Sequence, residues 1–149
     1  MIRAVVTCFR KTFTYTGRAG RPAFWWFFLF TTLVELVPVV PLYVLLEEAA
    51  EGWLTWLYLL VLLVTVPPTV AVTWRRFHDM DRSGLWTLAL MALIFAPEVM
   101  FLAGTDTDAS SLVALAGSAW WMIWMAFPGT EGENRFGRRD GDPDPVEAF

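Results

Sequence analysis

Four apolar stretches divide the chain, and short segments rich in charge, glycine or proline separate them. The stretches cover about residues 23–46, 53–74, 85–103 and 109–127. A helix needs roughly 20 mostly apolar residues to cross the hydrocarbon layer of a bilayer. Lipid offers the backbone no hydrogen-bond partner, so each stretch is expected to be a helix, which satisfies its own backbone. The pattern therefore predicts an all-α protein, an integral membrane bundle of four transmembrane helices.

The N-terminal residues show a second pattern, in which one side of a helix is apolar and the basic residues lie off it. At about 100° per residue, one narrow stripe contains the apolar side chains, which are Ile2, Val5, Val6, Phe9 and Phe13. The basic residues outside the stripe are Arg3, Arg10 and Lys11. This pattern predicts a short helix lying in the membrane interface. Packing of the same stripe against the bundle is the alternative.

The segment after the fourth stretch reads "PGTEGENRFGRRDGDPDPVEAF" from Pro128. Its glycines, prolines and charges do not supply the apolar residues that a folded core needs. We therefore expect a single membrane domain over residues 1–137 and a flexible, disordered tail over residues 138–149.

Composition supports the membrane class, because 56% of the residues are hydrophobic and nine of the 149 are tryptophan. Soluble domains of this length contain fewer hydrophobic residues and fewer tryptophans. The chain has one histidine, His78, and one cysteine, Cys8, so no metal-ligand set is expected. We expect no cofactor and no nucleic-acid partner.

The basic residues indicate an orientation. All 11 Lys and Arg residues fall before the first stretch, between the second and third, or after the fourth. The charged residues of the other two loops are Glu47, Glu48, Glu51, Asp106 and Asp108. Lys and Arg stay on the cytoplasmic side of a membrane protein. The distribution therefore predicts a multi-pass membrane protein with both termini in the cytoplasm.

The segment "TWRRFHDMDRSGLW", Thr73 to Trp86, connects the second and third stretches. If the second helix continues into it, Asp79 can pair with Arg75 at i,i+4 and with Arg76 at i,i+3. Ser83 is the residue type that caps a helix N-terminus, so we expect it to be the N-cap of the third helix. These features predict a tight corner held by charge pairs.

Three blocks of the sequence resemble a known family. They are "GRAGRPAFWWFFLF" from Gly17, "RRFHDMDRSGLW" from Arg75 and "PGTEGENRFG" from Pro128. Their order and spacing are similar to those of the bacterial inner-membrane family catalogued as domain of unknown function 805. The resemblance implies a small multi-helix protein of the bacterial inner membrane, and it brings no established activity. The predicted topology places all three blocks at the cytoplasmic face.

The arginines of these blocks suggest an anion site, because guanidinium groups form paired hydrogen bonds with phosphate. The candidate ligand-binding residues are Arg18, Arg21, Arg75, Arg76, His78, Asp79, Arg82, Asn134 and Arg135. We hypothesise that this basic face binds anionic headgroups of membrane lipids, a phosphorylated ligand, or a partner protein such as a second copy of the chain. The alternative is that the blocks lock the bundle and anchor it by charge.

An enzyme is a second hypothesis, in which His78 acts as a general base and Asp79 orients it during lipid headgroup or phosphoryl chemistry. Adjacent side chains on a helix point about 100° apart, which disfavours this pairing. No nucleophile or metal set accompanies the two residues. A non-enzymatic protein is therefore preferred, and no catalytic residue is assigned.

Two acidic residues, Glu35 and Glu98, lie inside the predicted spans at similar depths. Ionisable groups in hydrocarbon are costly, so they usually have a polar partner. Thr65 and Ser118 also fall near the middle of their spans. We expect these four residues to form a polar layer inside the bundle. The alternative is that Glu98 reaches outward and Glu35 bonds locally.

Overall fold

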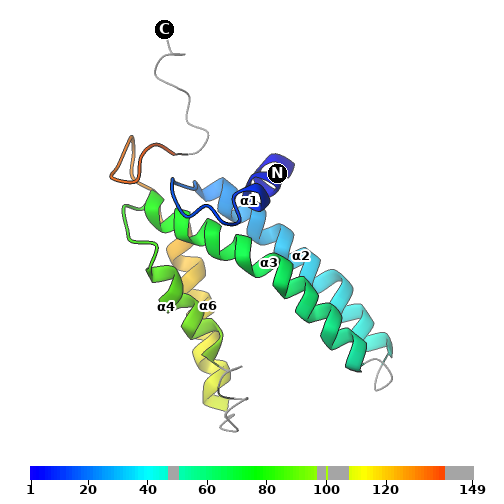
Figure 1. The fold of residues 1–149 in the computed structure, drawn as a ribbon. Helices are drawn as coiled ribbons and strands as arrows, with labels where there is room; N and C mark the ends of the chain where they lie inside the picture. The colour runs from blue at the N-terminus through cyan, green and yellow to red at the C-terminus, as the bar shows by residue number, and fades with distance from the viewer. Residues whose placement is uncertain (47–50, 97–99, 101–107, 140–149) are drawn as a thin grey trace. The chain divides into compact units, whose positions relative to one another are not determined.

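The structure, a computed structural model, describes residues 1–46, 51–96, 100 and 108–139. Within this part, the side chains of residues 37–46, 51–55 and 108–111 are not described. The described part is all-α, as predicted, and contains no strand (Figure 1). Its five helices are α1 (Ile2–Arg10), α2 (Arg21–Leu46), α3 (Glu51–Asp79), α4 (Trp86–Ile94) and α6 (Asp108–Ala126).

The chain forms two compact units. Among the described residues, the first unit contains those within 1–15 and 22–72, and the second contains those within 16–21 and 73–139. Helix α3 belongs to both units: its residues up to Val72 lie in the first unit, and those from Thr73 onward lie in the second. The predicted tail from residue 140 onward lies outside the described residues.

In the first unit, helix α1 packs against the beginning of α2. The ring of Phe9 lies 5.4 Å from that of Phe27 and 5.9 Å from that of Phe30, both in edge-on geometry. The Sγ atom of Cys8 lies 3.9 Å from the carbonyl oxygen of Ala23. Edge-on aromatic pairs contribute about 0.5–1.5 kcal/mol beyond the area they bury. The amphipathic helix expected at the N-terminus is thus present, and part of its apolar face contacts α2.

The first unit also contains half of the expected polar layer. The Thr65 hydroxyl on α3 donates a hydrogen bond to the Glu35 carboxyl on α2, with an Oγ1–Oε1 distance of 3.0 Å. A polar partner reduces the cost of placing a carboxyl among apolar helices. Glu98 lies outside the described residues, and Ser118 is half-buried on α6 in the second unit.

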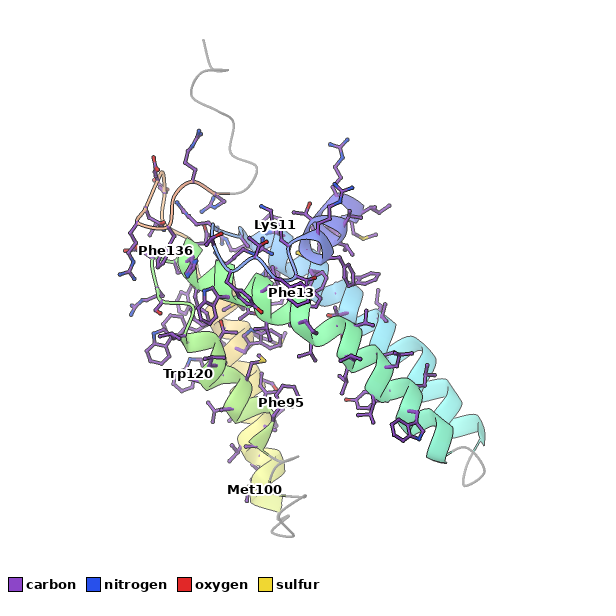
Figure 2. The ribbon with its side chains drawn as sticks, viewed as in Figure 1. Lys11, Phe13, Phe95, Met100, Trp120 and Phe136 are labelled. Carbon is purple, nitrogen blue, oxygen red and sulfur yellow. The ribbon has the colours of Figure 1, made fainter. Side chains whose placement is uncertain are left out.

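In the second unit, helices α4 and α6 pack against each other. A Cβ atom on Gly117 of α6 would lie 3.1 Å from the Cβ of Leu93 on α4, so glycine permits this close approach. The ring of Phe77 on α3 lies 6.1 Å from that of Trp124 on α6. Figure 2 labels Trp120 on α6 and Phe95 just after α4 among the side chains of this pair.

Helix α3 ends in a Schellman motif. The N–H of Arg82 donates to the carbonyl of Phe77 at 2.9 Å, and the N–H of Asp81 donates to that of His78 at 3.0 Å. Asp81 occupies the left-handed position of the motif, with a φ of 56°. Glycine is the usual residue there, and aspartate is one of the few others that adopt this conformation. The corner is therefore turned by backbone geometry as well as by charge pairs.

The prediction that Ser83 is the N-cap of the third helix is wrong. Leu85 is the N-cap of α4, and no described side chain caps it. The Ser83 hydroxyl instead accepts a hydrogen bond from the N–H of Leu85 at 3.3 Å, which closes a turn before the helix. Gly84 lies in this turn, and a Cβ atom there would overlap the indole of Trp74. The helix starts later than expected because this turn packs on Trp74.

In the described part of the chain, one helix is long and apolar enough to cross a membrane, and it runs from Trp56 to Asp79. A shorter apolar helix covers Leu112–Ala126. Large apolar side chains are exposed on both, including Leu63 at 71% and Leu115 at 66%. Extended apolar surface of this kind usually contacts another apolar medium or partner.

Candidate functional site

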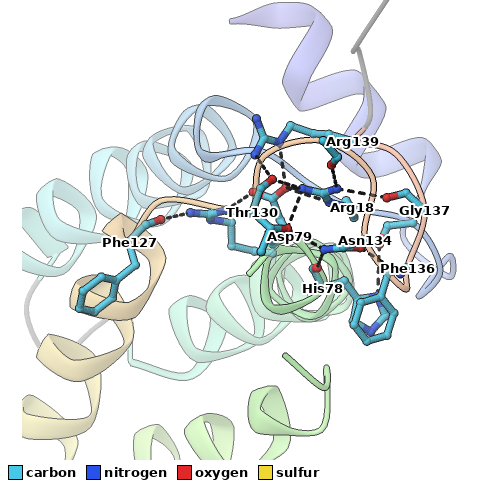
Figure 3. A network of polar contacts seen from close by, with 12 residues as sticks. Arg18, His78, Asp79, Phe127, Thr130, Asn134, Phe136, Gly137 and Arg139 are labelled. Carbon is cyan, nitrogen blue, oxygen red and sulfur yellow. Dashed lines mark hydrogen bonds and ion pairs between the residues drawn. The ribbon is translucent and has the colours of Figure 1, made fainter. Parts of the chain in front are cut away.

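One buried carboxylate, that of Asp79 at the end of α3, lies among three arginine side chains (Figure 3). Its Oδ1 atom accepts from Nη2 of Arg18 at 3.0 Å and from Nε of Arg139 at 2.8 Å. Its Oδ2 atom accepts from Nη1 of Arg76. The side chains of Arg18, Arg76 and Asp79 are buried, and that of Arg139 is partly exposed. We call these four residues the Asp79 cluster.

Arg18 is fully engaged inside the protein. Its Nε and Nη2 atoms donate to the Asp79 carboxylate. Its remaining N–H groups donate to backbone carbonyls of the C-terminal segment, which are those of Thr130, Gly132 and Gly137. A guanidinium has five N–H donors, and these bonds use all of them. Burial of Arg18 is therefore compensated by hydrogen bonds, without any external ligand.

Arg76 connects the end of α3 with the end of α6. Its Nε atom donates to the carbonyl of Met125 at 3.4 Å, and its Nη2 atom donates to that of Phe127. The N–H of Ala19 donates to the carbonyl of Arg75 at 3.0 Å, which holds the segment before α2 at the same place. The three sequence blocks therefore meet at the end of α3.

The C-terminal segment, residues 127–139, caps helix α3. The last carbonyls of a helix have no partner within the helix. Here the carbonyl of Asp79 accepts from the N–H of Thr130 at 2.8 Å, and that of His78 accepts from the Nδ2 of Asn134 at 2.9 Å. A glycine-rich segment without a core of its own is thus held by hydrogen bonds to a helix end and to Arg18.

The imidazole of His78 is held by a backbone carbonyl and an aromatic ring. Its Nδ1 atom lies 3.2 Å from the carbonyl oxygen of Gly17, which can only accept, so Nδ1 carries the proton. Its ring stacks on Phe136, with 3.8 Å between ring centroids and an interplanar angle of 4°. Gly17 has a φ of 82°, a backbone conformation that residues other than glycine rarely adopt.

Gly129 lies where the C-terminal segment passes the carboxylate. A Cβ atom there would overlap Oδ2 of Asp79 and lie 2.8 Å from Nη2 of Arg139. The close approach of this segment to the cluster therefore requires glycine. Gly132 and Gly137 serve differently, because they have φ angles of 67° and 91° and open space around their Cα atoms.

Residues 12–138 match the family model described as protein of unknown function, DUF805. The match covers most of the chain and includes all three blocks that meet at the end of α3. The chain belongs to the DUF805 family. No curated protein and no solved structure matches the chain.

The nine residues proposed as an anion site differ in burial in this DUF805 protein. Arg18, Arg75, Arg76, His78 and Asp79 are buried, and Asn134 is half-buried. The other three, which are Arg21, Arg82 and Arg135, are exposed.

Two of the exposed arginines have partners of their own. The guanidinium of Arg82 lies 5.7 Å from the ring centroid of Trp124. Arg135 pairs with Asp81 at 3.1 Å, and both side chains are largely exposed. Exposed pairs of this kind contribute little to stability.

Three residues of the DUF805 site were not identified from the sequence: Thr130, Phe136 and Arg139. Arg139 was assigned to the disordered tail, whereas the structure pairs it with Asp79. The main chains of Arg18 and Arg139 form an isolated parallel bridge, which places the arginine at the carboxylate. The available signal was the Arg138–Arg139 pair directly after the third block. That signal does not distinguish a buried ion pair from a basic tail.

The geometry of the DUF805 site does not favour acid–base chemistry by His78 and Asp79. The carboxylate is held by arginines, and the imidazole is held by Gly17 and Phe136. In the described residues no hydrogen bond joins these two side chains. The part of the chain that the structure describes contains no group of three His, Cys, Asp or Glu side chains suited to a metal ion.

Proposed function

We propose that this DUF805 protein is a non-enzymatic, multi-pass protein of the bacterial inner membrane whose basic cytoplasmic face binds anionic lipid headgroups. Four spanning helices with both termini in the cytoplasm form its frame. The Asp79 cluster ties that face together, and exposed arginines around it attract the lipid. The observation that supports these two separate roles is the difference in burial: Arg18 and Arg76 are buried, whereas Arg21 and Arg82 are exposed.

The charge pattern of the helices supports a membrane location. Helix α3 has no charged residue between Glu51 and Arg75, and α6 has none after Asp108. Apart from Asp108, the charged residues that the structure describes in the second unit lie around the end of α3 and in the segments leading into α2 and following α6. This separation of apolar and charged surface is what a bilayer requires, since charge in hydrocarbon is costly.

The exposed arginines provide the attraction. A basic residue close to an anionic membrane surface contributes roughly 1 kcal/mol to binding. The guanidinium groups of Arg21, Arg82 and Arg135 are exposed. Those of Arg18 and Arg76 are engaged by Asp79 and by backbone carbonyls. We therefore assign lipid attraction to the exposed group and stability to the buried group.

Replacing Arg21, Arg82 and Arg135 together by Gln is expected to weaken binding of phosphatidylglycerol by about a hundredfold, because three charges at roughly 1 kcal/mol each contribute about 3 kcal/mol. Binding of phosphatidylcholine should change little, because it has no net charge. Native mass spectrometry of the detergent-purified protein, titrated with each lipid, measures both.

A control with the opposite sign is available in the C-terminal segment. Glu131 and Glu133 are exposed there, and replacing both by Gln removes repulsion from an anionic headgroup. This variant should bind phosphatidylglycerol more tightly than the unmodified protein. An arginine triple variant that keeps the original preference for phosphatidylglycerol would contradict the proposal.

Cysteine labelling tests the proposed topology. In a Cys8→Ser background, a membrane-impermeant maleimide added to intact cells should label Glu48→Cys and Asp106→Cys. Asp142→Cys should react only after the membrane is permeabilised, because the basic residues predict a cytoplasmic C-terminus. Labelling of Asp142→Cys in intact cells would overturn the orientation.

A further inference from the structure

The first unit contains an apolar groove between α1 and α2, with a volume of about 270 Å³. Its lining side chains are all apolar: Met1, Ile2, Val5, Val6, Trp26, Leu29, Phe30 and Leu33. On α2 they follow the spacing of one helix face. Figure 1 shows α1 beside the beginning of α2, where the groove lies.

The groove is open at the surface of the unit. Ile2 on α1 is 73% exposed, and Leu29 on α2 is 44% exposed. The contacts of Phe9 with Phe27 and Phe30 hold α1 on α2 without covering these side chains. Open apolar surface of this kind marks a place where an apolar partner or lipid packs.

Two basic residues of α1 are helical neighbours of a residue that lines the groove. Arg3 and Arg10 are seven residues apart, so they project from the same side of α1, and Val6 lies three positions after the first and four before the second. Both arginines are exposed. No acidic residue precedes Glu35 in the sequence, so nothing in α1 or the start of α2 neutralises this charge.

We propose that this groove holds one acyl chain of an anionic phospholipid, with Arg3 and Arg10 attracting its headgroup. The proposal rests on the proposed function and adds a defined lipid site to it. An acyl chain needs no hydrogen bond, which matches a lining of apolar side chains. An extended peptide in the same groove would have unsatisfied backbone groups, which are costly in apolar surroundings. The charge beside the groove selects an anionic headgroup over a neutral one.

Filling the groove tests the acyl chain. Val6→Trp and Leu29→Trp each place an indole in it, and Leu36→Trp is the matched control at an exposed position of α2 that does not line the groove. Native mass spectrometry of the detergent-purified protein with phosphatidylglycerol should show one fewer retained lipid, or at least about tenfold weaker binding of it, for the first two variants. The control should retain lipid like the unmodified protein.

Removing the adjacent charge tests the headgroup. The double variant Arg3→Gln, Arg10→Gln should lose preference for phosphatidylglycerol over phosphatidylcholine at the retained lipid. It should still retain a neutral lipid, since the groove is unchanged. Near-ultraviolet circular dichroism of every variant distinguishes loss of lipid from loss of fold.

The two proposals fail differently. If the unmodified protein shows no preference for phosphatidylglycerol, the proposed function is overturned. If Val6→Trp and Leu29→Trp, folded, retain as much lipid as Leu36→Trp, the groove proposal is overturned whatever the headgroup preference. A preference that persists in these variants but is lost when Arg21, Arg82 and Arg135 are replaced would leave the proposed function standing alone.

Discussion

Replacing Asp79 by Asn is expected to lower the free energy of unfolding by about 3–5 kcal/mol, the usual cost of removing one partner from a buried ion pair. The substitution keeps the shape of the side chain and removes its charge. Arg18 and Arg76 would then remain buried with no carboxylate, and their hydrogen bonds to Asp79 would weaken. This is the largest single effect expected in the second unit.

Unfolding by sodium dodecyl sulfate in mixed micelles, followed by tryptophan fluorescence, measures this change. Asp81→Asn is the matched control, because the carboxylate of Asp81 pairs with Arg135 near the surface. Asparagine also tolerates the left-handed conformation at that position. The control should cost at most about 1 kcal/mol. Equal losses for the two variants would show that the Asp79 cluster does not hold the unit together.

Replacing Gly129 by Ala is expected to release the C-terminal segment from the end of α3. The added methyl group would overlap the Asp79 carboxylate and crowd Arg139, so either the segment or the cluster has to move. Overpacking of this kind costs typically about 1–3 kcal/mol. Because the segment is held through Thr130 and Asn134, its displacement would also uncap α3.

Limited proteolysis reports this release directly, because trypsin cleaves after the arginines of the segment, including Arg135 and Arg138. Cleavage should be faster in Gly129→Ala than in the unmodified protein. Gly132→Ala is the control, since open space surrounds that residue and only its φ of 67° is unfavourable. Its cost should be about 1 kcal/mol. Cleavage of the two variants at the same rate would contradict the steric role of Gly129.

The sequence by itself determined the all-α class and the family. Both depend on local or linear information: apolar runs of helical length, an amphipathic stripe from Ile2 to Phe13, and three blocks in a fixed order. The pairing of Arg76 with Asp79 was also predictable, because residues three apart on a helix are neighbours. The membrane orientation remains a prediction, based on the one-sided distribution of basic residues.

Only the tertiary structure decided which arginines are buried. Arg18 and Arg139 are 121 positions apart in the numbering, and no local pattern shows that they share the carboxylate of Asp79. The same holds for Thr130, which caps a helix that ended 51 residues earlier. In sequence, these residues have the composition of a solvated loop, because hydrogen bonds between distant segments leave no periodicity. Their role depends on three chain segments meeting at one helix end, where unpaired carbonyls and a buried carboxylate need donors.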